Sequence, residues 1–134
     1  MRLPLLFAVL LLPLIAVAEP PPFSPQLTGD AKVIYVDFWA SWCGPCRRSF
    51  PWLNEMQKRY GDRGFTVVGV NLDPKRDDAN RFLAAYPASF PLVFDPDGAY
   101  AEKYSLKGMP SAVLLNADGK VLARHVGFHQ NHTG

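Results

Sequence analysis

Cysteine is almost absent from this chain, because its 134 residues include only two, Cys43 and Cys46. Two cysteines form at most one disulfide, which excludes the multi-bridge framework that stabilises many small secreted domains. They are also too few for a zinc site of four protein ligands. Three histidines could add to the pair, but they stand at a strand end and in a polar tail: His125, His129 and His132. The sequence therefore predicts no metal ligands.

Strong charge is absent too. The formal net charge is +2 and the isoelectric point is about 8.6. This balance is too mild to indicate nucleic acid or an anionic membrane surface as a partner. The part of the chain expected to fold also lacks internal repeats and low-complexity runs, and its length suits one domain.

The first eighteen residues resemble a targeting segment. Arg2 supplies a basic start, residues 3–17 are apolar, and Ala16-Val17-Ala18 has the small-x-small form of a cleavage site. A retained anchor is the alternative, but this apolar run is shorter than the roughly 20 residues of a spanning helix. We expect residues 1–18 to be a signal peptide cleaved after Ala18, which leaves an exported protein without a stable membrane anchor.

The rest of the chain predicts an extended lead-in followed by one domain. Residues 19–30 contain four prolines and are expected to be extended, and residues 31–134 form the domain. Apolar runs predict strands near residues 33–39, 65–70, 91–94, 111–115 and 121–126. Helical patterns follow Cys46 and cover 77–86 and 99–104. A βαβ unit followed by a hairpin implies an α/β fold with a mixed sheet and flanking helices.

The two cysteines occupy a distinctive setting. They lie three positions apart, directly after an apolar strand and at the start of a helical segment. The unpaired N–H groups and positive dipole end of a helix favour a thiolate there, so we expect Cys43 to be the nucleophile and Cys46 the resolving thiol. Pro45 suits a first helical position, and we expect Gly44 to permit a close turn.

Asp37 interrupts the apolar strand six positions before Cys43. A carboxylate in a covered layer without a cation has a raised pKa, which suits a proton acceptor near neutral pH. The alternative is a structural role, in which Asp37 pairs with Lys32 or with backbone at the strand end.

Three segments together resemble a known family. Residues 37–46, Asp-Phe-Trp-Ala-Ser-Trp-Cys-Gly-Pro-Cys, resemble the active-site segment of thioredoxins, and Gly108-Met109-Pro110 is similar to the loop that carries their cis-proline. The section after the second strand, with Asn71-Leu72-Asp73 and Phe90-Pro91, resembles the insertion of the TlpA/ResA branch of exported thiol-disulfide oxidoreductases. The resemblance implies a thioredoxin-like fold and a periplasmic location. It also implies that Asp37 assists deprotonation of Cys46.

The same resemblance implies a substrate surface around the dithiol. The backbone of residue 109 would pair with an extended substrate. The residues expected on this surface are Trp42, Gly44, Pro45, Met109 and Pro110.

The chain departs from the family pattern at two places. Ser49 stands where ResA-like and cytochrome-maturation relatives carry a glutamate. Any specialised role of that glutamate is therefore in doubt for this chain. Residues 128–134 show no apolar periodicity, so the usual C-terminal helix is expected to be missing from a shortened domain. An uncovered sheet face would lower stability or favour dimerisation.

These features predict an exported enzyme that reduces disulfides of other exported proteins and takes its electrons from a membrane donor. Its redox centre would be the Cys43–Cys46 pair, with no further cofactor. Two alternatives stay open. One is a copper- or metal-handling module that uses the thiols as ligands, and the other is the same enzyme acting as an oxidase.

Overall fold

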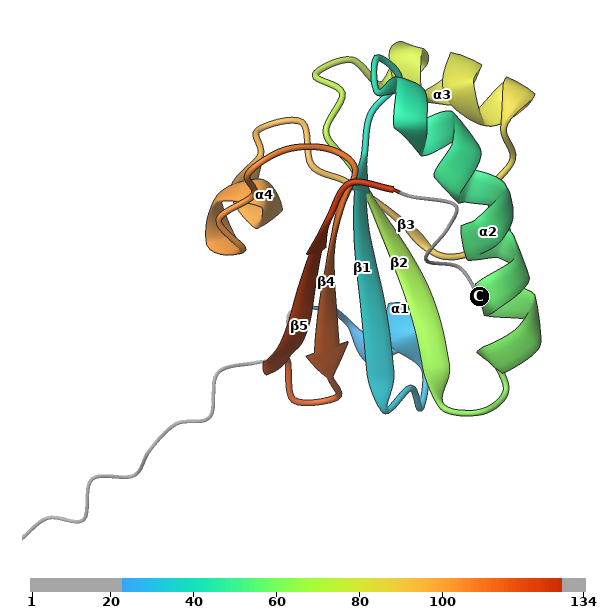
Figure 1. The fold of residues 1–134 in the computed structure, drawn as a ribbon, viewed down its shortest axis with the longest axis vertical. Helices are drawn as coiled ribbons and strands as arrows, with labels where there is room; N and C mark the ends of the chain where they lie inside the picture. Colours follow the sequence, from blue (N-terminus) through green and yellow to red (C-terminus); the bar gives the residue numbers. More distant parts are fainter. Residues whose placement is uncertain (1–22, 129–134) are drawn as a thin grey trace, which may run out of the picture.

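A computed structural model describes residues 23–128. Its five strands form one mixed sheet in the order β3-β2-β1-β4-β5 (Figure 1). The strands are β1 (Val33–Trp39), β2 (Phe65–Asn71), β3 (Leu92–Phe94), β4 (Ser111–Asn116) and β5 (Val121–Val126). β1, β2 and β3 run parallel to one another, whereas β4 is antiparallel to both β1 and β5. The predicted βαβ unit and hairpin are both present.

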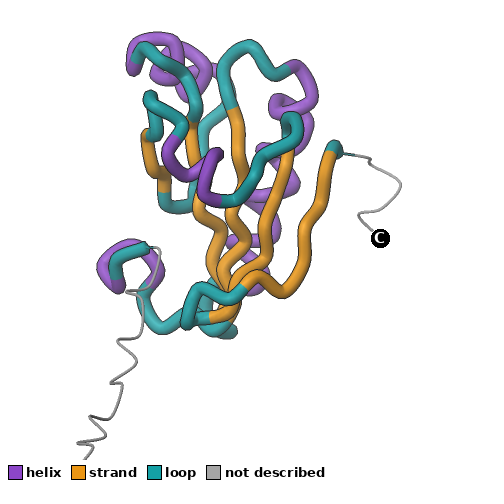
Figure 2. The backbone as a smooth tube through the Cα atoms, turned by 90° about the vertical axis from the view of Figure 1, so that its left-hand side faces the viewer, coloured by secondary structure: helices purple, strands orange, loops and turns teal. Residues whose placement is uncertain are grey.

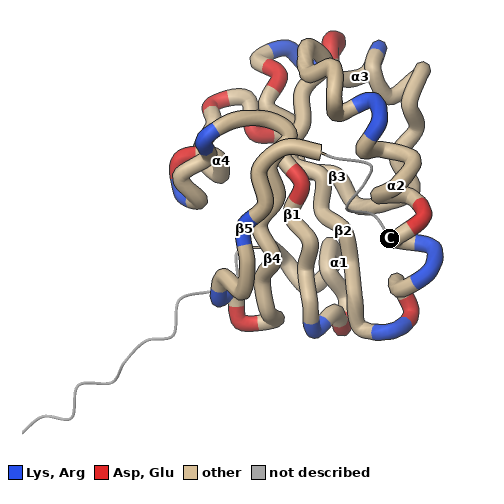
Figure 3. Tube along the Cα trace, viewed as in Figure 1, with Lys and Arg blue, Asp and Glu red and all other residues tan. Residues whose placement is uncertain are grey.

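Four helices connect or flank these strands: α1 (Pro25–Thr28), α2 (Gly44–Tyr60), α3 (Arg76–Ala85) and α4 (Ala99–Lys103). The bounds of α3 and α4 lie within one residue of the sequence expectation, and α2 begins at Gly44, before the helical pattern that follows Cys46. Turned by 90°, the tube shows the strands running alongside one another through the middle of the fold (Figure 2). Lys, Arg, Asp and Glu lie mainly on helices and loops rather than on the strands (Figure 3).

The alternation of side chains along β1 divides the core into two clusters. Ile34, Val36 and Phe38 face the cluster that contains Tyr104, beside α4. Tyr35 and Trp39 face the opposite cluster, which α2 and α3 cover. In that second cluster the Phe50 ring lies 5.0 Å from the rings of both Trp39 and Phe82. Both faces of β1 are therefore covered, which explains its nearly continuous apolar sequence.

The expected extended lead-in differs from the structure in its described part. Pro25–Thr28 forms the short helix α1, because Pro25 fits its first turn and Ser24 O accepts N–H bonds from Leu27 and Thr28. Phe23 is only 4% exposed, and its ring stacks on Tyr100 at 5.2 Å. The packed core thus begins before residue 31.

Two sequence expectations concern residues outside the described part. These are the signal peptide of residues 1–18 and the lack of a C-terminal helix, which involves residues 129–134 together with His129 and His132. Within residues 23–128, no helix is both long enough and apolar enough to cross a bilayer.

Candidate functional site

The two cysteines lie at the start of α2 and form a disulfide with an S–S distance of 2.17 Å. Cys43 is the N-cap residue, and Pro45 occupies the first turn of the helix. The Cys43 N–H donates to Ala40 O at 3.1 Å, which closes the turn after β1. The end of an apolar strand and a proline-initiated helix together place the pair where the chain passes from β1 to α2.

Exposure differs between the two sulfur-bearing residues and their neighbours. Cys43 is 6% exposed, Cys46 is fully buried, and Trp42 is 60% exposed. A Cβ added at Gly44 would meet no atom within 4 Å, so open space borders the disulfide on this side. A partner can therefore approach Cys43 but not Cys46, and an exposed indole lies beside the approach.

The expected reason for a glycine at position 44 is wrong. Gly44 does not have a left-handed φ, and a side chain there would clash with nothing. The turn is made by the Cys43 N-cap and does not depend on glycine's conformational freedom.

The Met109–Pro110 peptide bond is cis. Met109 packs against the hydrophobic cluster that also contains both cysteines. The loop is held from both sides: Ser111 Oγ donates to Gly108 O at 2.5 Å, and the Gly127 N–H donates to Pro110 O at 2.8 Å. Gly127 has a φ of 82°, a conformation that glycine adopts without strain.

Asp37 faces the side of the sheet that α2 covers. It is 3% exposed, and its Oδ2 has no hydrogen-bond partner. Burial away from water raises the pKa of this carboxyl well above its usual value. Among the described residues it forms no ion pair, so the alternative pairing with Lys32 is not present. Desolvation, and next the charge of Asp37, raise the pKa of Tyr35 on the same strand.

Ser49 lies one helical turn after Cys46, at the position where some relatives have a glutamate. It is buried, and its Oγ donates to Cys46 O at 3.1 Å. Position 49 therefore supplies no carboxylate near Cys46, and the buried carboxylate on this face of β1 is Asp37.

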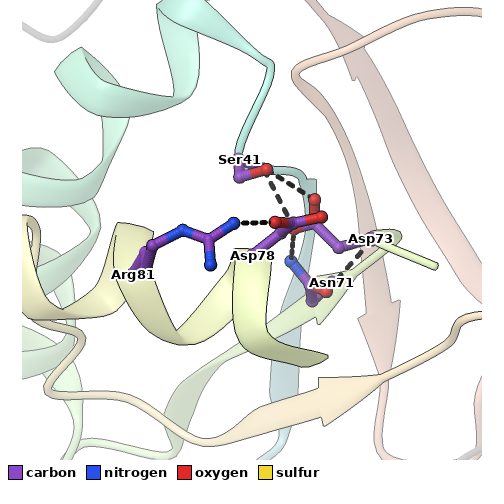
Figure 4. Close-up of polar contacts among 5 residues, drawn as sticks. All are labelled: Ser41, Asn71, Asp73, Asp78 and Arg81. Carbon is purple, nitrogen blue, oxygen red and sulfur yellow. Dashed lines mark hydrogen bonds and ion pairs between the residues drawn. The ribbon is translucent and has the colours of Figure 1, made fainter. Parts of the chain in front are cut away.

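A second buried carboxylate was not recognised from the sequence as part of the site. Asp73 is 3% exposed and accepts hydrogen bonds from Ser41 N, Ser41 Oγ and Asn71 Nδ2 at 3.0, 2.6 and 2.7 Å (Figure 4). Its own N–H donates to Asn71 Oδ1 at 3.1 Å. The network joins the end of β2 to the loop two residues before Cys43. The polar residues at the end of a buried strand were the available signal, but Asp73 lies 32 positions from Ser41 in the sequence.

A pocket adjoins this network between the helices α2 and α3. Ser41 and Arg47 line it, as do Asp78 and Arg81, which form the ion pair drawn in Figure 4. The Arg47 guanidinium also lies 5.9 Å from the centre of the Tyr86 ring. The lining of this pocket therefore includes polar side chains and charged side chains of both signs.

Metal ligands do not gather in the part of the chain that the structure describes. Residues 23–128 contain no group of three or more His, Cys, Asp or Glu side chains that could hold an ion. His125 lies on β5 and is exposed.

Known proteins resemble this chain in sequence and in structure. ResA, a thiol-disulfide oxidoreductase of Bacillus subtilis, is 31% identical over 91 residues, which cover 68% of this chain and 51% of ResA. The chain thus spans about half the length of the curated relatives it matches. A Chlorobium tepidum structure assigned as thiol:disulfide interchange protein DsbE is 54% identical and has a TM-score of 0.74 over 78% of this chain and 74% of that chain. The exposed lipoprotein thioredoxin Etrx1 of Streptococcus pneumoniae is 28% identical, with a TM-score of 0.67 over 78% of this chain and 81% of that chain.

The family match covers most of the chain, from residue 19 to residue 133. It agrees with the fold, with the cis-proline loop and with the disulfide at the start of α2. The chain belongs to the Redoxin family, and its fold is thioredoxin-like.

Proposed function

We propose that this protein is an exported thiol-disulfide oxidoreductase that reduces disulfides in other exported proteins. The observation that carries the proposal is the Cys43–Cys46 disulfide at the N-terminus of α2, in which Cys43 keeps 6% of its surface exposed and Cys46 keeps none. This asymmetry supports a fixed order of reaction, in which the accessible sulfur meets the partner first. The oxidoreductases among its relatives support the same chemistry.

In the reduced protein, the Cys43 thiolate attacks one sulfur of the target disulfide. A mixed disulfide forms, and the second target sulfur leaves with the electron pair. Cys46 then loses its proton and attacks Cys43, which releases the first target sulfur and restores the Cys43–Cys46 disulfide. Asp37 is the proposed acceptor of the Cys46 proton. A thiol donor at the membrane would supply the two electrons for the next cycle.

Trp42 and the Met109–Pro110 loop are proposed to hold the target. Trp42 is exposed and precedes Cys43 in the chain, and Met109 packs against the cluster that contains both cysteines. A cis-proline loop at this place offers the backbone of residue 109 to an extended target strand.

The direction of electron flow is tested by the reduction potential of the Cys43–Cys46 pair. A reductant is expected to have a potential near that of thioredoxin, about −270 mV, whereas an oxidant would lie near DsbA, about −120 mV. Insulin reduction should be lost in Cys43→Ser, and Cys46→Ser should accumulate the mixed disulfide. Stoichiometric copper binding without any disulfide reduction would overturn the proposal in favour of a metal-handling module.

Export is tested separately, because it depends on residues 1–18. The full chain produced in a bacterium is expected in the periplasmic fraction, shortened by the signal peptide at Ala18. A variant with Ala16 and Ala18 changed to Arg should remain uncleaved. Recovery of an uncut wild-type chain from the cytoplasm would contradict this part.

A further inference from the structure

A row of paired residues crosses the sheet beneath α2. Asp37 on β1 pairs with Ala112 on β4, and Ala112 pairs with His125 on β5. Directly paired residues of neighbouring strands point to the same face of a sheet. The middle residue of the row is an alanine, so only a methyl group stands between the strand of the buried carboxyl and the strand of the imidazole.

A small cavity lies along this row. Its lining includes Asp37, Ala112 and His125 on the sheet, together with Ser49 from α2. Its volume of about 10 Å³ is roughly the room that one water molecule needs. The Oδ2 atom of Asp37 is buried without a protein partner, so a water in this cavity would have a polar group to bind.

Two of the lining residues come from different elements and differ in exposure. Ser49 is a buried residue of α2, and its hydroxyl donates to the carbonyl of Cys46, the residue that must lose a proton. His125 lies on β5 and is exposed to solvent. The cavity is therefore lined both by the helical turn after the buried thiol and by an imidazole at the surface.

Charged groups around the cavity are few. Its titratable lining residues are Asp37, Tyr35 and His125, and no Lys or Arg lines it. Burial and the Asp37 charge raise the pKa of Tyr35, so this phenol keeps its proton near neutral pH and cannot accept another. Histidine is the side chain that exchanges protons readily near neutral pH.

We propose that His125 relays protons between Asp37 and solvent through a water in this cavity. The inference rests on the proposed function. When Cys46 attacks the mixed disulfide, its proton passes to the Asp37 carboxylate, and the target sulfur leaves with the electron pair. The Asp37 proton then moves through the water to the imidazole of His125 and on to solvent. Neither Asp37 nor His125 changes its oxidation state. His125 acts through Asp37, so it is a positioning residue and not a catalytic one.

The test is the rate of the Cys46 resolution step, measured by stopped flow from a preformed mixed disulfide in dilute buffer. His125→Gln keeps a polar side chain of similar size, and His125→Ala opens the cavity mouth. Both are expected to slow the step about tenfold, less than the 10²- to 10⁴-fold that direct general acid–base catalysis supplies. Lys120→Gln, an exposed change in the same hairpin, should leave the rate unchanged.

Added imidazole distinguishes a relay from a structural effect. It should restore the His125→Ala rate in proportion to its concentration and leave the wild-type rate unaffected. Rates within twofold of wild type in both variants would overturn the relay, and so would a slow His125→Ala rate that imidazole does not restore.

A second readout needs no substrate and separates this inference from the proposed function. The pH profile of the Asp37 carboxyl carbon, followed by NMR, should differ between wild type and His125→Gln. A wild-type protein that fails to reduce disulfides but shows this coupling would overturn the function alone. An Asp37 titration identical in wild type and His125→Gln would overturn the relay.

Discussion

The buried carboxylate of Asp73 is expected to stabilise the fold by tying the disulfide loop to the end of β2. It accepts three hydrogen bonds, two from Ser41 and one from Asn71. Asp73→Ala removes all three acceptor positions. Asp73→Asn keeps the shape, since the Ser41 hydroxyl can turn to accept a bond from the new amide, and removes only the charge.

The bonding pattern sets the size of each effect. In Asp73→Ala, the Asn71 amide and the Ser41 N–H lose their partner, whereas the half-exposed Ser41 hydroxyl can bind water. The buried Asn71 donor and the partly buried Ser41 N–H, left without partners, cost about 1–3 kcal/mol each, so the loss should be about 2–6 kcal/mol. In Asp73→Asn, charge-assisted bonds become neutral ones, and the loss should be about 1–2 kcal/mol. The larger value is a substantial part of a typical domain stability of about 5–15 kcal/mol.

Urea unfolding of the oxidised protein, followed by far-UV circular dichroism, measures these losses. The slope with urea should stay constant while the midpoint falls. Asp77→Asn, an exposed change on α3, is the control and should shift stability by less than about 0.5 kcal/mol. Wild-type stability in Asp73→Ala, or equal losses in the alanine and asparagine variants, would refute the argument.

Three further predictions concern the core. Burial raises the pKa of Asp37, so the folded protein holds a proton there that the unfolded chain has released, and wild-type stability falls as pH rises above about 3.8. The stability advantage of Asp37→Asn over wild type should therefore grow by about 1.4 kcal/mol per pH unit above pH 3.8 until the raised pKa is reached, and it should disappear below pH 3.8 in urea titrations. Equal stabilities at every pH would contradict this. Gly69→Ala should lower the free energy of unfolding by about 1–3 kcal/mol, measured in urea, because the new Cβ would lie 2.8 Å from the Phe90 ring. Gly44→Ala is the control and should leave the free energy of unfolding unchanged, because no atom lies within 4 Å of the new Cβ. Phe23→Ala should lower the free energy of unfolding by about 3 kcal/mol in the same assay. Gln26 is exposed, so Gln26→Ala is the control, and an equally small loss in both variants would place Phe23 outside the core.

Much of the site was predictable because its signals are local. An apolar run before Cys43 and a proline at 45 were enough to place a strand, a turn and a helix start in the right order. The burial of Asp37 followed from its place in an otherwise apolar strand. Met109–Pro110 was expected beside the disulfide by resemblance, and in the structure its peptide bond is cis and Met109 packs against the cluster that contains both cysteines.

The remainder depends on residues distant in sequence. The prolines before residue 26 favoured an extended segment, and nothing local indicated that Phe23 would stack on Tyr100. Asp73 finds Ser41 only when β1 and β2 lie side by side. Likewise, the row from Asp37 to His125 requires the register of three strands, which hydrophobic pattern alone does not specify.

The aromatic cluster beneath the disulfide gives the protein a built-in optical signal. Trp39 is fully buried in the same cluster as both cysteines, whereas Trp42 is mostly exposed. An indole in apolar surroundings emits at shorter wavelength than one in water, and a nearby disulfide quenches indole emission by accepting an electron from the excited ring. Opening of the disulfide should therefore brighten the blue-shifted emission of Trp39. The redox state of the disulfide can then be followed through the fluorescence of Trp39, a fully buried side chain, without an added label.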